Sequence, residues 1–428
     1  MLELNFIRNQ KARIIEGLKV RNFSEADVEI INKIINFDDR RKELQTNLDI
    51  SLAERNKLSK EIGQLFKQGK REDAESLRKK VNTLKDEFGS VEQELKSVIE
   101  ELDSLLLQVP NVPHPSVPGG NSEEDNEVYK AWGAPLPELP ESALPHWELA
   151  EIYQLFDLKL GTKITGSGFP LYRGQGARLE RALINFFLDE GHKAGYEEIM
   201  PPILVNEDTA RATGQLPDKE GQMYYVEKDN LYLIPTAEVP LTNIYRDVIL
   251  NENDLPIKLT GYTPCFRREA GSYGAHVRGL NRVHQFNKVE IVRIEHPDRS
   301  YEALEEMIAH VAGLLDKLEL PFRILRLCGG DLGFTSALTF DFEVYSAAQK
   351  RWLEVSSVSN FETYQSNRMK LKFKGEAKKN QLVHTLNGSA LALARIVAAL
   401  LENNQVADGI VIPKVLHSYT GFDKIVKR

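Results

Sequence analysis

Four arginines lie within one short segment of the chain, at positions 267, 268, 278 and 282. The segment reads Pro264-Cys-Phe-Arg-Arg-Glu-Ala-Gly-Ser-Tyr-Gly-Ala-His-Val-Arg-Gly-Leu-Asn-Arg-Val-His-Gln-Phe-Asn-Lys-Val-Glu290, and its apolar, strand-like ends flank a loop with glycines at 271, 274 and 279. Guanidinium groups on such a hairpin can hold several phosphate oxygens through bidentate contacts, and they stay charged at physiological pH. A β-hairpin with a solvated basic loop explains the same residues equally well, so the chemistry alone leaves both interpretations open.

Any nucleotide held by this hairpin must be bound without the common loop motifs. The sequence has no Gly-x-x-x-x-Gly-Lys-Ser/Thr loop, no Gly-x-Gly-x-x-Gly after a strand, and no His-Ile-Gly-His motif paired with Lys-Met-Ser-Lys-Ser. The arginine hairpin is therefore the leading candidate for a phosphate site.

The elements that must position this hairpin predict a mixed fold. Amphipathic helices are predicted over residues 177–194 and 301–318, and β-rich runs over residues 231–234, 288–294 and 339–344. Because strands follow strands without regular helical crossovers, the pattern favours an antiparallel sheet covered by helices over a doubly wound fold. We predict an α+β class.

Composition limits the class of protein. At 428 residues the chain is long enough for two domains, and 42% apolar and 28% charged residues are ordinary values for a globular protein. The net charge of −8 argues against non-specific coating of nucleic acid, although a local basic patch or recognition of RNA shape remains compatible with it.

No window reaches the roughly 18 apolar residues of a membrane span, and we expect a cytoplasmic location. Only Cys265 and Cys328 occur, without paired spacing, so we expect no structural zinc.

The N-terminal quarter of the chain carries a coiled-coil pattern. An unbroken 4-3-4-3 spacing joins Leu77, Val81, Leu84, Phe88, Val91, Leu95, Val98, Leu102 and Leu105. A weaker copy with two polar interruptions precedes it: Leu44, Leu48, Ser51, Arg55, Leu58, Ile62 and Leu65. Between them, Gly69 can end one helix and Asp73 can cap the next, which predicts an antiparallel hairpin over about residues 40–107.

Two functions fit this hairpin. Residues 40–105 hold 14 Lys or Arg and 14 Asp or Glu, so a solvated coiled coil that spaces or dimerises domains is favoured by periodicity alone. The alternative is an RNA-holding arm with phosphate contacts near its tip, at Lys67, Lys70, Arg71, Arg78, Lys79 and Lys80. Dense prolines after residue 109 then stop any helix. We predict a helical arm over residues 1–108, a Pro-rich linker over 109–145 and a catalytic domain over 146–428.

The arginine segment resembles motif 2 of the class II aminoacyl-tRNA synthetases, in the form found in seryl-tRNA synthetases. Three colinear segments resemble other parts of that family: His192–Asn206 resembles motif 1, Ile234–Pro240 the serine-site loop, and His384–Arg395 motif 3. A long helical arm is itself that family's tRNA-binding domain, so the resemblance covers essentially the whole chain. It implies the class II fold, formation of seryl-adenylate from serine and ATP, and transfer to tRNA(Ser). Selenocysteine tRNA is a further candidate acceptor, and motif 1, around Pro201, implies a homodimer.

The resemblance also implies roles for individual residues. Arg267 would contact the α-phosphate and the amino-acid carboxylate, and Arg395 would close the nucleotide site; these two are the candidate catalytic residues. The other implied ATP-site residues are Arg268, Glu269, Arg282, Val283, Phe286, Glu354, Val355, Ser356 and Ser357. Within that set, Glu354 and Ser357 would hold Mg²⁺. The implied serine-site residues are Thr236, Ala237, Glu238, Arg267, Glu290, Asn387 and Ser389.

The chain departs from the family pattern at two places. Ala390 and Ala394 stand where many relatives have glycine, and we expect their methyl groups to be accommodated by a helix slightly further from ATP. Ala275-His276 replaces a Lys or Arg followed by Asp in the motif 2 loop, which affects the expected tRNA contacts.

Three alternative functions remain at this point. A related adenylating enzyme that loads a carrier protein would lack the long arm. A class II synthetase for threonine, proline or histidine would usually carry its tRNA-binding domain after the core, where few residues remain here. A coiled-coil interaction protein with an inactive enzyme body is disfavoured because Arg267, Glu269, Glu354 and Arg395 are all present.

Overall fold

The computed structural model describes residues 1–218, 221–269, 278–375 and 379–427, without the side chains of residues 83–87. The chain divides into two compact units. The first comprises Met1–Lys19 with Phe23–Pro110, and the second Val20–Asn22 with Asn111–Arg428. Within the described residues, no helix is long and apolar enough to cross a membrane.

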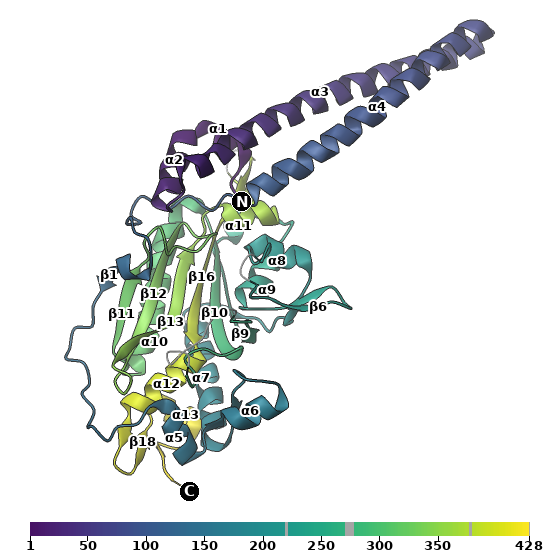
Figure 1. Ribbon diagram of the computed structural model, residues 1–428. Coiled ribbons are helices and arrows are strands. Elements are labelled where there is room, and N and C mark those ends of the chain that lie inside the picture. The colour runs from purple at the N-terminus through teal and green to yellow at the C-terminus, as the bar shows by residue number, and fades with distance from the viewer. Residues whose placement is uncertain (219–220, 270–277, 376–378, 428) are drawn as a thin grey trace. The chain divides into compact units, whose positions relative to one another are not determined.

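The first unit is helical, and its two long helices form the predicted hairpin (Figure 1). It contains α1 (Leu4–Asn9), α3 (Glu25–Lys67), α4 (Arg71–Leu106) and all of α2 (Lys11–Val20) except its last residue. Ser24 caps α3 by accepting from the backbone N–H of Asp27, whose side chain accepts from Ser24 in return. At the turn, Gly69 adopts a φ of +77°, as expected for a residue that ends a helix.

The predicted cap at Asp73 is wrong. Lys70 occupies the N-cap position of α4 without a side-chain cap bond, because the chain reverses within three residues of the end of α3. Asp73 instead lies in the first turn of α4, where its negative charge faces the positive end of the helix dipole.

The seam between α3 and α4 is the predicted apolar one. Its best-buried cluster consists of Leu44, Leu48, Phe88, Leu95 and Val98. The side chain of Leu84 lies outside the described part of the structure.

One polar interruption of the seam has a structural explanation. The guanidinium carbon of Arg55 lies 5.8 Å from the centroid of the Phe88 ring, so this residue packs on an aromatic face. An ion pair from Arg40 to Glu94, at 2.5 Å, also joins the two helices.

The second unit is built on an eight-stranded sheet with the order β1-β11-β12-β13-β16-β10-β9-β4 (Figure 1). The strands are β1 (Glu127–Lys130), β4 (Glu197–Glu198), β9 (Ile257–Phe266), β10 (Gln285–Glu295), β11 (Phe322–Arg326), β12 (Leu338–Ser346), β13 (Arg351–Asn360) and β16 (His384–Ala392). All neighbouring pairs are antiparallel except β4 with β9. The predicted α+β class and antiparallel catalytic sheet are confirmed.

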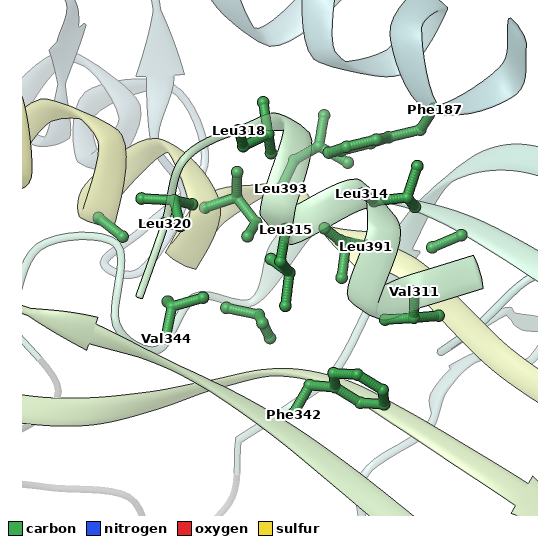
Figure 2. Close-up of a cluster of buried hydrophobic side chains, with 14 of the residues drawn as sticks. Phe187, Val311, Leu314, Leu315, Leu318, Leu320, Phe342, Val344, Leu391 and Leu393 are labelled. Carbon is green, nitrogen blue, oxygen red and sulfur yellow. The ribbon is translucent and has the colours of Figure 1, made fainter. Parts of the chain in front are cut away.

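Three amphipathic helices build the main core against this sheet: α7 (Gly174–Lys193), α10 (Ser300–Lys317) and α12 (Leu393–Asn403). Figure 2 shows Val311, Leu314 and Leu315 of α10 packed between Phe187 of α7 and Phe342 of β12. The predictions of helices over 177–194 and 301–318 agree with α7 and α10 to within a few residues. Their spacing of apolar residues is that of a helix with one buried face.

The remaining elements are short. The helices are α5 (His146–Tyr153), α6 (Leu158–Ile164), α8 (Glu207–Thr213), α9 (Glu238–Asn243), α11 (Tyr364–Met369) and α13 (His417–Thr420). Small sheets join β5 (Leu204–Val205), β7 (Leu231–Leu233) and β6 (Tyr224–Val226), and also β15 (Asn380–Leu382), β14 (Lys372–Lys374) and β8 (Ile249–Asn251). Two more sheets join β17 (Gln405–Val406), β18 (Gly409–Val411) and β19 (Lys424–Ile425), and β2 (Phe156–Asp157) with β3 (Leu171–Tyr172).

The Pro-rich segment is not a free linker in its described course through the second unit. Its residues 127–130 form β1, which pairs with β11 at the edge of the main sheet. Asn111 is buried, and its side-chain amide donates to the carbonyl oxygens of Thr335 and Phe361 at 2.9 and 2.8 Å. The predicted absence of α-helix holds for this described segment, which contains only a short 3-10 helix, Glu123–Asp125. Proline density does not report whether an extended segment packs on a neighbouring surface.

Candidate active site

A cavity of about 530 Å³ in the second unit gathers side chains from β10, β13, β16 and the segment before α9. Most residues proposed from the sequence line it: Thr236, Glu238, Arg267, Glu269, Arg282, Val283, Phe286, Glu290, Glu354, Val355, Ser356, Ser357, Asn387, Ser389 and Arg395. Residues as far apart in the chain as Thr236 and Arg395 therefore share one site.

Strand alternation explains why these residues share one side of the sheet. On β10, Phe286, Lys288 and Glu290 line the cavity, whereas Val289 and Ile291 belong to the main core. Successive side chains on a strand point to opposite faces, so the core helices cover one face while the polar residues collect on the other. The hairpin of β9 and β10 pairs in direct register, with Cys265 opposite Phe286, which confirms the predicted hairpin.

Arg267 and Arg282 each contact a different residue of the cavity lining. The Arg267 guanidinium lies 5.4 Å from the centroid of the Phe286 ring, and its backbone N–H donates to the His284 carbonyl oxygen at 2.9 Å. Arg282 pairs with Glu269, with 2.9 Å between Nε and Oε2. Among the described residues, these contacts leave N–H groups of both guanidiniums for other acceptors, and such groups bind phosphate or carboxylate oxygens.

Arg395, near the start of α12, closes another side of the cavity. Its Nε donates to the Asn281 carbonyl oxygen at 2.9 Å, and its Nη1 donates to the Glu354 carbonyl oxygen at 2.6 Å. The Glu354 side chain is exposed at the cavity, and Ser357 is half-buried three residues further along β13. Across the sheet, Asp341 is the register partner of Ser357.

Glu354 and Ser357 bring oxygen atoms of the kind that hard cations prefer to the described cavity lining. Burial, with the nearby charge of Glu354 adding to it, raises the pKa of Asp341 well above its ordinary value. The Oδ1 atom of Asp341 is buried and has no hydrogen-bond partner among the described residues. Within that same described part, no group of three or more His, Cys, Asp or Glu side chains forms a complete metal site.

The other end of the cavity contains two buried carboxylates. Oε2 of Glu290 lies 2.7 Å from Nζ of Lys288 and accepts from the Thr236 hydroxyl at 3.1 Å. Oε1 of Glu238 accepts from the side-chain amide of Gln365 at 2.7 Å. Burial, and then the negative charge of Glu290, raise the pKa of Glu238 to about 7. A ligand ammonium would relieve both effects, because it brings a positive charge to the two carboxylates.

Sequence reasoning missed several residues of this end. Lys288 could have been found, since it lies two residues before Glu290 on a predicted strand and so shares its face. Gln365, on α11, orients Glu238 but does not line the cavity, and no local pattern marks it. Other cavity residues that were not predicted include Gln215, Gln222, Asn281 and Ser359.

Two of the proposed residues do not line the cavity. Arg268 is exposed, and its guanidinium packs over the Tyr224 ring at 5.8 Å. Ala237 is fully buried in a core cluster with Leu241 and Val292, although its neighbours Thr236 and Glu238 do reach the cavity.

The two alanines that depart from the motif 3 pattern, Ala390 and Ala394, lie on different elements. The expectation that both alanines lie on a helix facing ATP is wrong for Ala390, which lies on β16 and packs into the main core. Ala394, on α12, does line the cavity. Gly271, Gly274, Ala275 and His276 lie outside the described residues.

The segment that resembles motif 1 lies at the edge of the main sheet. It runs from the end of α7 through β4 and β5 to Asn206, and within it the Met200 side chain is 89% exposed. A second cavity of about 490 Å³ is lined by residues of this region, including Glu180, Ile184, Leu188 and Met200.

The basic residues proposed for the arm tip, Lys67, Lys70, Arg71, Arg78, Lys79 and Lys80, are all exposed. Lys80 lies 3.4 Å from Glu54 across the hairpin.

Comparison with known proteins agrees with this geometry. Residues 1–113 match the model of the seryl-tRNA synthetase N-terminal domain, and residues 224–404 match the tRNA synthetase class II core domain (G, H, P, S and T). The serine–tRNA ligase of Salinibacter ruber is 50% identical over 427 residues, which cover 99% of each chain.

Solved structures give the same result. The seryl-tRNA synthetase of Pyrococcus horikoshii, solved with ATP, is 34% identical, with a TM-score of 0.91 and complete coverage of both chains. The cytoplasmic serine–tRNA ligase of Naegleria fowleri, solved with AMP, is 27% identical, with a TM-score of 0.86, and the match covers 100% of this chain and 99% of the other. Given full-length identity of this level, an α+β fold with the class II sheet and a cavity of this composition, the chain belongs to the seryl-tRNA synthetase family.

Proposed function

We propose that this chain attaches L-serine to tRNA(Ser) in an ATP-dependent reaction that passes through seryl-adenylate. The observation that carries the proposal is the division of one cavity into a carboxylate end, with Glu238 and Glu290, and an arginine end, with Arg267, Arg282 and Arg395. Such a cavity can hold the ammonium of an amino acid and the phosphates of ATP at the same time.

The first step joins two anions, so its barrier falls when fixed cations lie between them. A serine carboxylate oxygen attacks the α-phosphorus of ATP, a new P–O bond forms, and the bond to the pyrophosphate leaving group breaks. Arg267 is assigned to the α-phosphate and the serine carboxylate, with its side chain supported by the Phe286 ring. Arg282 and Arg395 neutralise the remaining phosphates, while Glu269, Val283 and Phe286 form the nucleoside pocket.

In the second step, a terminal ribose hydroxyl of tRNA attacks the seryl carbonyl carbon, and AMP leaves. Thr236, Glu238, Glu290, Asn387 and Ser389 are assigned to serine. A site that hydrogen-bonds the substrate hydroxyl rejects alanine, because alanine would leave buried polar groups unpaired.

Mg²⁺ is the implied cofactor, and the donor set fits it. Glu354 and Ser357 supply oxygen atoms, which this ion prefers, and the phosphates and water would complete its coordination. When bound, the ion neutralises charge on the ATP phosphates. The unpartnered Oδ1 of Asp341, opposite Ser357 in the described sheet, is consistent with a cation nearby.

The partners proposed are tRNA(Ser), held by the exposed basic residues of the arm, and a second copy of this chain, bound through the surface around Pro201 and Met200. Selenocysteine tRNA and a cytoplasmic location remain predictions. The exposed apolar Met200 and the adjoining cavity support the dimer surface.

The test is the exchange of labelled pyrophosphate into ATP by the full-length chain, with each of the twenty amino acids in turn. We expect exchange with serine that exceeds exchange with alanine and threonine by orders of magnitude. Equal exchange with another amino acid would show that the substrate assignment is wrong, and charging of a carrier protein in place of tRNA would overturn the second step.

A further inference from the structure

A fully buried histidine lies directly behind the arginine end of the cavity and has no role in the reaction described above. His146 begins α5, and Glu402 lies near the end of α12; both are 0% exposed. Nδ1 of His146 is 2.6 Å from Oε1 of Glu402, and the backbone N–H of Leu280 donates to Nε2 at 2.8 Å. Because Nε2 accepts a hydrogen bond, it carries no proton, and the ring proton on Nδ1 is donated to Glu402.

Leu280 and Asn281 form part of the cavity wall. They follow Gly279, whose φ of +72° is left-handed, and a Cβ atom there would lie 2.2 Å from Nε2 of His146. The preceding residue, Arg278, stacks on Trp147, with 4.8 Å between the guanidinium carbon and the ring centroid. This segment of the wall is therefore docked on residues 146 and 147 through three successive positions.

A second chain of hydrogen bonds joins Glu402 to Asn281 in the cavity wall. Glu402 accepts from the side-chain amide of Gln349 at 2.9 Å, and Gln349 in turn accepts from the Asn281 side chain at 2.8 Å. Glu402 also accepts from the Ser346 hydroxyl and from the His146 backbone N–H. The carbonyl oxygen of Asn281 then accepts from Nε of Arg395, which lies on the same helix as Glu402. The polar network thus begins and ends on α12 and passes through the cavity wall.

We propose that His146 is a positioning residue for the nucleotide: paired with Glu402, it fixes the backbone of Leu280 and Asn281, and through Asn281 the guanidinium of Arg395. The inference rests on the proposed function, since it assumes that this end of the cavity holds ATP. If this pair served the fold alone, its loss would change stability only; a positioning role makes the affinity for ATP depend on the acceptor at Nε2.

Two substitutions test the two hydrogen bonds of the His146 ring separately. In H146N the amide nitrogen takes the place of Nδ1 and still donates to Glu402, but nothing reaches the Leu280 N–H. In H146Q the side-chain oxygen takes the place of Nε2 and accepts from Leu280, while the donor to Glu402 is lost. H384N is the matched control, because His384 is a half-buried histidine whose Nδ1 lies 2.7 Å from the Ser300 hydroxyl and which does not line the cavity.

The experiment measures KM for ATP and for serine by pyrophosphate exchange, and Kd for ATP by calorimetry, on the full-length enzyme. For H146N we expect KM and Kd for ATP to rise about threefold to tenfold, the range that one hydrogen bond supplies, with KM for serine within about twofold of the unsubstituted enzyme. H146Q should stay closer to the unsubstituted enzyme, and H384N should lower the melting temperature without changing KM for ATP.

An unchanged KM for ATP in a folded H146N enzyme overturns the inference, as does an equal rise in H384N. If H146N does not fold, Q349M decides, because Gln349 is only partly buried and its removal cuts the second chain of hydrogen bonds to Asn281 alone. Q349M should raise KM for ATP by about threefold, and an unchanged KM for ATP in this variant would also overturn the inference. Failure of the proposed function looks different, since the unsubstituted enzyme would then show no serine-dependent exchange.

Discussion

Nη1 of Arg395 donates to the backbone carbonyl oxygen of Glu354 at 2.6 Å and lies 3.6 Å from the carboxylate of the same residue. The guanidinium assigned to phosphate is therefore held by the residue assigned to Mg²⁺. Binding of MgATP would satisfy both charges at once, because the phosphates supply anions to Arg395 and the ion supplies a cation to Glu354.

Arg395→Ala should lower kcat/KM for ATP in pyrophosphate exchange by on the order of 10² to 10³, the usual cost of removing one preorganised cationic or hydrogen-bonding group. Arg395→Lys keeps the charge but not the planar fork of donors, so its kcat/KM should lie between those of the Ala variant and the unsubstituted enzyme. Steady-state exchange kinetics check both variants. Equal activity of the Lys variant and the unsubstituted enzyme would show that only charge is needed at this position.

Glu354→Gln tests the cation site. The amide keeps the shape of the side chain but loses its charge, so the Mg²⁺ concentration for half-maximal exchange should rise by about tenfold. Titration of Mg²⁺ at fixed ATP measures this. Glu207→Gln is the control that should leave the titration unchanged, because Glu207 pairs with Arg211 on α8 and does not line the cavity. An unchanged Mg²⁺ dependence in the Glu354 variant would remove it from the metal site.

Serine binding should depend on pH through Glu238. Burial and the charge of Glu290 raise the pKa of this carboxyl to about 7, and its ionised form is the one that attracts an ammonium group. As the pH falls below about 7, a growing fraction is protonated, so kcat/KM for serine should fall by up to tenfold per pH unit while KM for ATP stays constant. The substrate ammonium and carboxylate do not titrate between about pH 6 and 8.

Glu238→Gln is the companion variant. It should bind serine more weakly above about pH 7, approach the unsubstituted enzyme as the pH falls, and lose the dependence between about pH 6 and 8. A flat profile in the unsubstituted enzyme, or the same slope in the variant, would assign the titration to another group.

Ionisation of the buried Glu180 carboxyl should lower the free energy of unfolding at neutral pH. It is 4% exposed, its Oε1 accepts from Asn287 at 3.1 Å, and its Oε2 has no partner among the described residues. Burial raises its pKa to about 7, above its ordinary 4.5. The folded state then holds a proton that the unfolded state has released, so the free energy of unfolding should fall as pH rises from about 4.5 to 7 and level off above.

Glu180→Gln should accordingly raise the free energy of unfolding at pH 8 by about 1 to 3 kcal/mol, with little gain at about pH 4.5. Tryptophan fluorescence reports this, since Trp132, Trp147 and Trp352 all belong to the second unit. Glu190→Gln, on the same helix, is the control with the opposite sign. Its carboxylate pairs with Lys193 and Lys317, which hold its pKa below the ordinary value against burial, so this variant should lose stability at pH 8.

The arm tip should matter for tRNA and not for adenylation. Replacing Lys67, Lys70, Arg71 and Arg78 together with Gln should weaken tRNA binding and reduce the slope of log affinity against log salt, by about 0.7 to 0.9 for each phosphate that the arm no longer neutralises. Pyrophosphate exchange should not change. Replacing the acidic residues Glu72, Asp73 and Glu75 of the same tip is the control, and it should not weaken tRNA binding. Loss of exchange in the basic set would contradict a modular arm.

Local sequence patterns determined much of this protein. The 4-3 spacing predicted the paired helices, the period of about 3.6 predicted α7 and α10, and the strand–loop–strand pattern around Arg267 predicted the hairpin of β9 and β10. These features depend on which face of an element is apolar, and that information lies within a few turns or strand residues of the chain. The motifs, read by resemblance, then placed most of the proposed residues in one cavity.

Only the tertiary structure decided which distant residues meet. Gln365 orients Glu238 from a helix 127 positions away, and His146 reaches Leu280 across 134 positions. Ala390 and Ala394 belong to the same motif and both pack in the core, yet only Ala394 also lines the cavity, because the strand ends between them. Burial and charge at a site come from all of the elements that surround it, so the raised pKa of Glu238 and the fixed position of Arg395 exist only once the sheet and its helices have come together.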